Sequence, residues 1–144
     1  QIETPTSMSN FVLETSTNSS ASFLTLDAAG NLVGSGCCIS VIRVSGSGSV
    51  VRDVEVLNVE GGVGVYFVDK SSKGNHLLRV HVHHCFYGVI FASGLDAAHR
   101  NVFQGGTIEG VACDSIVFAG YGEAVGNIVR NSGYDCGTDP PSPA

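Results

Sequence analysis

Apolar and polar residues alternate with a period of two along most of the chain, which is typical of β-strands with one buried face. Val80 and Val82, for example, flank the polar residue His81. The apolar positions are mostly Val, Ile and Phe, and runs of Gly, Ser and Asn separate one group from the next. Because no segment keeps a period of 3.6, the pattern predicts short strands joined by tight turns and no significant helix.

This alternating pattern repeats every 26 residues. The repeats begin at Ser49, Asn75, Asn101 and Asn127. When they are aligned in this frame, chemically similar residues fall into shared columns. Two inward columns are predicted, one of Val51, Leu77, Phe103 and Val129 and the other of Val56, Val82, Ile108 and Tyr134. A unit of this size cannot bury its apolar face alone, so the repeats are expected to stack as a solenoid.

The second half of each repeat shows a similar but less regular match. Val65 aligns with Phe91 in the 26-residue frame. In the last repeat the alignment slips by one residue, so that Ile116 and Phe118 match Val89 and Phe91, and the frame is expected to return at Asn127.

Asparagine recurs at one turn of three repeats, and this column resembles the asparagine ladders of stacked β-turns. Together with the repeat length and the β-branched columns, it makes the chain resemble a right-handed parallel β-helix of the pectin-lyase-like type over roughly residues 36–139. The resemblance implies an all-β solenoid of about four to five 26-residue rungs. That superfamily includes polysaccharide lyases, hydrolases, epimerases, phage tailspikes and plain scaffolds.

Three regions are predicted along the chain. Residues 1–35 fit the repeat less well and are expected to form a degenerate first rung or a cap, because terminal repeats are usually atypical. Residues 36–137 are predicted to form the parallel β-helix. Residues 138–144 contain three prolines and are expected to be a flexible tail.

Composition excludes several classes of protein. The seven basic and thirteen acidic side chains give a net charge of −6, which argues against a nucleic-acid partner. No apolar run approaches the ~20 residues of a membrane span, so no membrane partner is expected.

Five cysteines occur without a CxxC spacing and are interpreted as small buried apolar residues, with a Cys113–Cys136 disulfide as the weaker alternative.

The polar positions between the inward columns should face solvent and form three surface columns. These columns are Asp53, Arg79, Gly105 and Asn131; Glu55, His81, Thr107 and Gly133; and Leu57, His83, Glu109 and Asp135. Charged residues are scarce elsewhere and gather here. We therefore expect a binding face, with His81 as the acid or base, Glu55 orienting it and Glu109 as a further catalytic candidate. The predicted substrate-binding residues are Asp53, Arg79, His83 and Asp135, with Arg79 suited to an anionic group.

Two other interpretations of this face remain open. Its charges could simply pair across rungs, for example Asp53 with Arg79 and Glu55 with His81. The sequence also suggests a metal site at His81, His83 and His84, completed by Glu55 or Glu109, since His81 and His83 point the same way, but a flat sheet is expected to splay its side chains. The sequence analysis therefore assigns no metal and no cofactor.

The favoured function is a module that engages an extended polysaccharide or oligosaccharide, by binding or by cleavage. Whether it is an enzyme stays open: motifs of the superfamily's pectate lyases and polygalacturonases are missing, and any activity would be of the polysaccharide lyase or glycoside hydrolase kind. The alternative is a structural or oligomerisation module of a larger spike-like or extracellular protein, acting as a homotrimer or within a longer parent chain. Either function implies an extracellular or virion-surface location.

Overall fold

The structure, a computed structural model, describes residues 2–3, 11–28, 39–68, 72–92 and 97–133. Within these ranges the regular structure is almost entirely β-strand, with one short 3-10 helix, as the period of two predicts. The elements are β1 (Ile2–Glu3), β2 (Phe11–Thr15), β3 (Ser20–Ser22), β4 (Thr25–Asp27), β5 (Ser40–Val44), β6 (Val50–Arg52), β7 (Glu55–Phe67), β8 (His76–Leu78), β9 (His81–Phe91), η1 (Ala97–His99), β10 (Asn101–Gln104), β11 (Thr107–Glu109), β12 (Ile116–Phe118), β13 (Gly122–Val125) and β14 (Ile128–Arg130).

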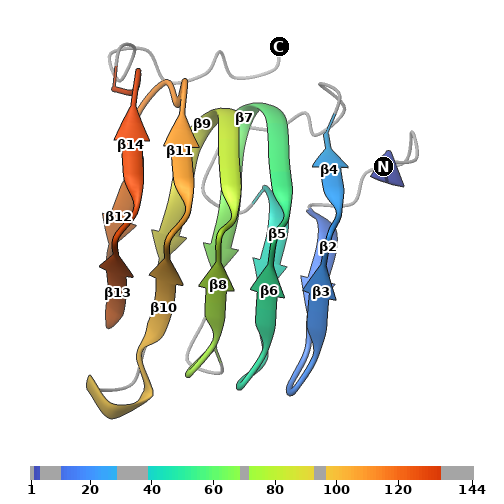
Figure 1. Ribbon diagram of the computed structural model, residues 1–144, viewed down its shortest axis with the longest axis vertical. Helices are drawn as coiled ribbons and strands as arrows, with labels where there is room; N and C mark the ends of the chain where they lie inside the picture. The colour runs from blue at the N-terminus through green and yellow to red at the C-terminus, as the bar shows by residue number, and fades with distance from the viewer. Residues whose placement is uncertain (1, 4–10, 29–38, 69–71, 93–96, 134–144) are drawn as a thin grey trace, which may run out of the picture.

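The strands stack in parallel as a β-solenoid, which confirms the predicted fold class (Figure 1). One face is a five-stranded sheet with the order β13-β10-β8-β6-β3. The second face follows the order β1-β4-β7-β9-β11-β14. The long strands β7 and β9 bend onto a third face, where they pair with β5 and β12 and where β2 pairs with β5.

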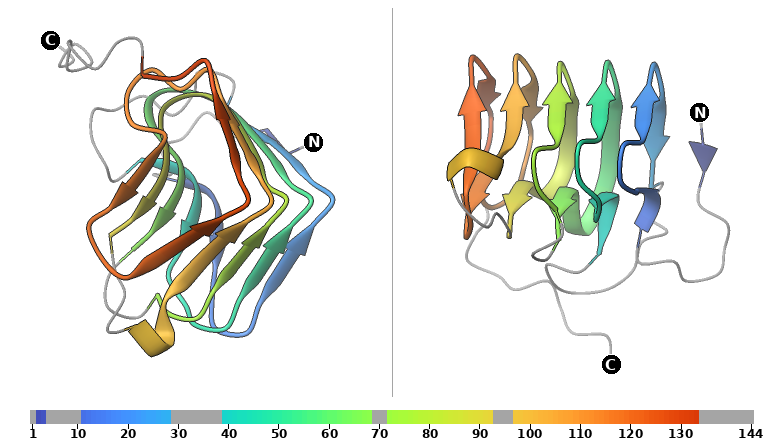
Figure 2. Two further views of the ribbon diagram at one scale, coloured as in Figure 1. Left: turned by 60° about the vertical axis from the view of Figure 1, so that its left-hand side comes forward. Right: turned by 90° about the horizontal axis from the view of Figure 1, so that it is seen from below.

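Seen along the stack, the chain traces similar outlines one behind another, and from below the rungs stand side by side (Figure 2). The solenoid has about three turns, slightly fewer than the four to five rungs predicted. The turn of β2, β3 and β4 and the turn of β12, β13 and β14 each lead into residues outside the described ranges, so neither closes within them. Part of the predicted region 1–35 is described, and its strands β2, β3 and β4 pair with β5, β6 and β7 of the next turn, respectively.

The interior consists of apolar side chains stacked in columns. Leu26, Val56, Val82 and Ile108 are paired on successive strands, and each of them is fully buried. On the third face, the rings of Phe67, Phe91 and Phe118 stack with centroids 4.8 and 5.0 Å apart. Burial of each such side chain contributes about 1.5–3 kcal/mol, so the stacked columns are the main source of stability.

The last turn departs from the predicted 26-residue step. Cross-rung contacts link residues 30 positions apart at the first step, 26 in the middle and 21 at the last. Ile108 therefore pairs with Val129, and the prediction that Tyr134 continues this column is wrong. Val129 was likewise expected beside Phe103, whose partner is Ala124. The chain reaches β13 by a connection that is shorter than the one containing η1 in the turn before.

A second departure lies at the bend of β7. The ladder between β7 and β9 shifts register between Val59 and Val63, where the chain reads Glu-Gly-Gly. The extra residues of this bulge place Val65 beside Val89, so the predicted match of Val65 with Phe91 is wrong. The expected match of Ile116 and Phe118 with Val89 and Phe91 is confirmed.

Asparagine side chains form a buried ladder at one corner of the solenoid, as predicted for two of three residues. The Oδ1 of Asn75 accepts the Ser49 N–H at 2.8 Å, and the Oδ1 of Asn101 accepts the Asn75 N–H at 3.1 Å. The prediction that Asn127 extends this ladder is wrong. Asn127 lies at the next corner, where it accepts the Gly106 N–H at 2.8 Å, because the shortened last turn moves it out of register.

Several predictions fall on residues outside the described ranges, namely the tail 138–144 and the cysteines 37, 38 and 136. Cys85 and Cys113 are buried, as expected of small apolar residues, and burial raises the pKa of the Cys85 thiol to about 12. In the described part of the chain, no helix is both long and apolar enough to cross a membrane.

Candidate functional site

The predicted polar face is the outward surface of the second face, β4-β7-β9-β11-β14. One outward column consists of Thr25, Glu55, His81, Thr107 and Ile128. The neighbouring column consists of Asp27, Leu57, His83, Glu109 and Arg130. The structure therefore brings Glu55, His81, His83 and Glu109 together as predicted, on adjacent strands spaced about 4.8 Å apart.

In the turns that contain β7, β9, β11 and β14, residues with positive φ hold the two corners that frame this face. Asp53 and Arg79 occupy the corner before the strands, with φ of 54° and 52°. His84 occupies the corner after the first segment of β9, with φ of 53°. In the later turns the same corners are Gly105 and Gly110, where the left-handed backbone carries no steric cost from a Cβ.

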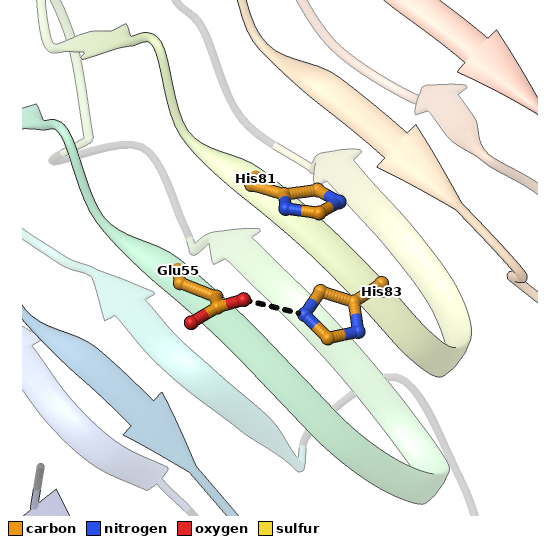
Figure 3. A group of neighbouring side chains, drawn as sticks. All are labelled: Glu55, His81 and His83. Carbon is orange, nitrogen blue, oxygen red and sulfur yellow. Dashed lines mark hydrogen bonds and ion pairs between the residues drawn. The ribbon is translucent and has the colours of Figure 1, made fainter.

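Glu55 pairs with the histidine diagonally across the ladder. The Nε2 of His83 lies 3.1 Å from the Oε1 of Glu55 (Figure 3). The sequence predicts that Glu55 orients His81, its direct neighbour in register, whereas the hydrogen bond of Glu55 to a histidine is with His83. The other carboxylate oxygen of Glu55 accepts a hydrogen bond from the Thr25 hydroxyl at 3.2 Å. The hydrogen bond from His83 is the main reason that the pKa of Glu55 is lowered, so the group is a carboxylate at neutral pH.

His83 is hydrogen-bonded through both ring nitrogens. Its Nδ1 lies 2.7 Å from the Nδ1 of His84, whose position at the corner turns its ring back toward the strand. If Nε2 of a neutral His83 donates to Glu55, then Nδ1 accepts from His84. Glu55, His83 and His84 thus form a continuous hydrogen-bonded chain, and His84 is a member that was not among the residues predicted for catalysis or substrate binding.

His81 lies beside these three hydrogen-bonded residues, and its Nε2 makes no hydrogen bond. Its ring centroid is 4.5 Å from that of His83, with an angle of 34° between the rings. Its Nε2 is buried and makes no hydrogen bond, and the nearest carboxylate oxygen, Oε2 of Glu109, is 3.9 Å away. Burial, followed by the nearby His83, lowers the pKa of His81, so the imidazole is neutral at neutral pH. A neutral imidazole with a free lone pair can act as a base or as a ligand.

The charged residues at the two ends of the face are already paired. Nε and Nη2 of Arg79 donate to the two carboxylate oxygens of Asp53 at 2.6 and 2.8 Å. This bond is the main reason that the pKa of Asp53 is lowered. The bidentate pair is the one that the cross-rung interpretation predicted. It occupies two of the five N–H donors of Arg79 and balances the charge of the guanidinium.

At the other end, Glu109 is held by the last turn. Nη2 of Arg130 donates to its Oε2 at 2.7 Å, and Asn131 donates to its Oε1 at 3.4 Å. The Arg130 contact is the main reason that the pKa of Glu109 is lowered. Arg130 takes the position predicted for Asp135, which lies outside the described residues. Aligning Gly126 with Gly105 at the corner would have revealed this shorter step from the sequence.

The two histidines converge instead of splaying, contrary to the expectation for a flat sheet. Glu55, His81 and His83 each offer one potential ligand atom, and these atoms all lie within 4.8 Å of one another. The side chains are partly accessible, with 43%, 39% and 14% of their surfaces exposed, respectively. We call these three residues the Glu–His cluster.

Comparison of the chain with protein-family models, with curated proteins and with solved structures finds no match. The parallel β-solenoid is therefore established by the structure itself, and the functional argument rests on the residues of this chain.

Proposed function

We propose that the outward face of β4, β7, β9 and β11 binds an extended, uncharged polysaccharide, within a β-helix of the pectin-lyase-like type. The observation that carries the proposal is the Glu–His cluster at the centre of this face. Its unsatisfied hydrogen-bonding capacity lies at His81: 39% of this side chain is exposed, and its Nε2, which is buried in the unbound face, has no hydrogen-bond partner. Thr25 and Thr107 extend the polar column on either side, so hydroxyl groups of a linear polymer would meet partners on successive strands.

The charge distribution favours a neutral glycan over an acidic one. The net charge of the chain is −6, and the guanidinium groups of Arg79 and Arg130 are engaged by Asp53 and Glu109. A uronate would meet guanidinium groups whose charge Asp53 and Glu109 already balance, so the arginines would attract it less than unpaired ones. The proposed role of Arg79 is therefore to pair with Asp53 at the edge of the face and not, as the sequence suggests, to hold an anionic group of the substrate.

The proposal is tested by measuring binding to a panel of neutral and acidic polysaccharides by calorimetry. We expect binding to a neutral glycan, and His81→Ala should weaken it at least tenfold because the central partner is lost. His76→Ala is the matched control, since His76 is exposed on β8 of a different face. Absence of binding to every polysaccharide, or equal losses in both variants, would reject the proposal. Product analysis of the same mixtures addresses cleavage, for which the neutral imidazole of His81 is the candidate base.

An assembly module is the second candidate, favoured by the apolar surface of the last turn. Five large apolar residues are more than two-fifths exposed there, namely Phe118, Tyr121, Val125, Ile128 and Val129. Phe118 and Val129 end inward columns whose other members are buried, so the apolar interior is open at this end of the described stack. Another strand edge could cover such a surface.

Light scattering tests the assembly function. A homotrimer would have three times the 14.9 kDa mass of the chain. Val129→Lys should convert it to the monomer by placing a charge on the exposed apolar end. Thr107→Lys, on the outward face of the adjacent β11, is the control and should leave the mass unchanged. A monomeric parent chain at all concentrations would exclude this function.

A further inference from the structure

We propose that the Glu–His cluster is a binding site for a divalent transition-metal ion of the Zn²⁺ type. Two ligands come from β9 and one from β7, so the ion would join adjacent strands on the outward face (Figure 3). The inference goes beyond glycan binding and does not depend on it.

The donor atoms are close to the spacing that such an ion requires. Metal–ligand bonds of about 2.0–2.1 Å in a tetrahedral site place neighbouring donors about 3.3–3.4 Å apart. The Nε2 of His83 and Oε1 of Glu55 are 3.1 Å apart, so both can bind one ion, which would replace the proton they share. The donor atom of His81 lies within 4.8 Å of both, and a small rotation of its ring completes the set.

Surrounding groups hold the donors in the orientation that coordination needs. Histidine ligands of metals usually donate their second ring N–H to a fixed acceptor, and ligating carboxylates are themselves hydrogen-bonded. With the ion on Nε2 of His83, its Nδ1–H would donate to Nδ1 of His84, which is 2.7 Å away. The Thr25 hydroxyl already donates to the free oxygen of Glu55 at 3.2 Å.

The ligand types select the class of ion. Two imidazoles and one carboxylate suit Zn²⁺ and its first-row neighbours, whereas Ca²⁺ and Mg²⁺ prefer oxygen ligands alone. Glu109 is not counted as a ligand because Arg130 and Asn131 occupy its carboxylate. Three protein ligands leave coordination positions open on the exposed side, as in zinc sites that bind water or substrate. The thiol of Cys85 is buried among core residues and does not belong to this set.

The test is a titration of the full chain with Zn²⁺ alone, in competition with a chromophoric chelator and without glycan. We expect saturable binding of one ion per chain that His83→Ala weakens by more than about 100-fold. His84→Ala, which removes only the supporting hydrogen bond, should weaken it by about 10–100-fold. His76→Ala is the matched histidine control and should bind like the parent. Far-UV circular dichroism of each variant confirms that the fold is retained.

Two further arms make the assignment specific. The same titration with Cys37, Cys38 and Cys136 replaced by serine removes the thiols that lie outside the described residues, and the affinity should be unchanged. Substituting Cu²⁺ and recording its electron paramagnetic resonance should show two nitrogen ligands. The proposal is overturned if no saturable binding occurs up to about 1 mM Zn²⁺, if His83→Ala binds like the parent, or if the cysteine variant loses the ion.

Discussion

Val82→Asp is expected to unfold the protein. Val82 is fully buried between Val56 and Ile108 on the two neighbouring strands. An aspartate there would place an unpaired carboxylate in an apolar column, a change that costs more than about 4 kcal/mol. Because domains of this kind have total stabilities of about 5–15 kcal/mol, most of the stability would be lost. Urea denaturation followed by circular dichroism measures the effect.

Val129→Asp is the matched control for this prediction. It introduces the same side chain in the same inward column, but at the end of the stack, where Val129 is 48% exposed. The carboxylate can remain hydrated there, so we expect a loss below about 2 kcal/mol. Equal losses in the two variants would contradict a continuous interior that is closed at Val82 and open at Val129.

The second large effect is expected for Asn75→Ala. The side chain of Asn75 accepts from the Ser49 N–H at 2.8 Å and donates to the Gly46 carbonyl at 2.8 Å, and it is buried. Alanine would leave both backbone groups without these partners. Each buried unsatisfied group costs about 1–3 kcal/mol, so we expect a loss of about 2–5 kcal/mol in the free energy of unfolding.

Asn127→Ala separates the observed arrangement from a regular asparagine ladder. Asn127 makes the same kinds of bonds, accepting from Gly106 N–H at 2.8 Å and donating to the Phe103 carbonyl at 2.9 Å, but it is only partly buried. Water can replace it, and we expect a loss of about 1 kcal/mol. A ladder with a uniform 26-residue step would instead make the two substitutions similar.

Much of the central stack could be predicted from the sequence. The pairing of Val56 with Val82 and of Val82 with Ile108 follows from residues of one type recurring at one spacing. The hydrogen bonds of Asn75 and Asn101 follow from the same spacing. Glu55, His81 and His83 could be assigned to one surface because strand residues alternate between two faces.

A uniform 26-residue step could not predict the last turn or the bulge, because their positions depend on the lengths of individual connections; only the spacing of Gly105 and Gly126 signals the shorter last step. The shorter step brings Val129 instead of Tyr134 to Ile108, and Arg130 to Glu109. From the sequence alone, Val129 fits either of two inward columns, beside Phe103 or beside Ile108. In the observed register of the last turn, Phe118 stacks on Phe91 and β13 still pairs with β10.

The sequence by itself determined that this chain is an all-β, parallel stack and which polar residues share its outward face. The reason is that the period of two within a strand and the constant step between strands are both present in the sequence. Stacking then only aligns the repeats. Only the tertiary structure decided which of these side chains bond to one another. Side-chain rotation pairs Glu55 with His83 instead of His81 and brings the ring centroids of His81 and His83 to 4.5 Å. Such contacts depend on rotamers and corner geometry, which the spacing of residues along the chain does not encode.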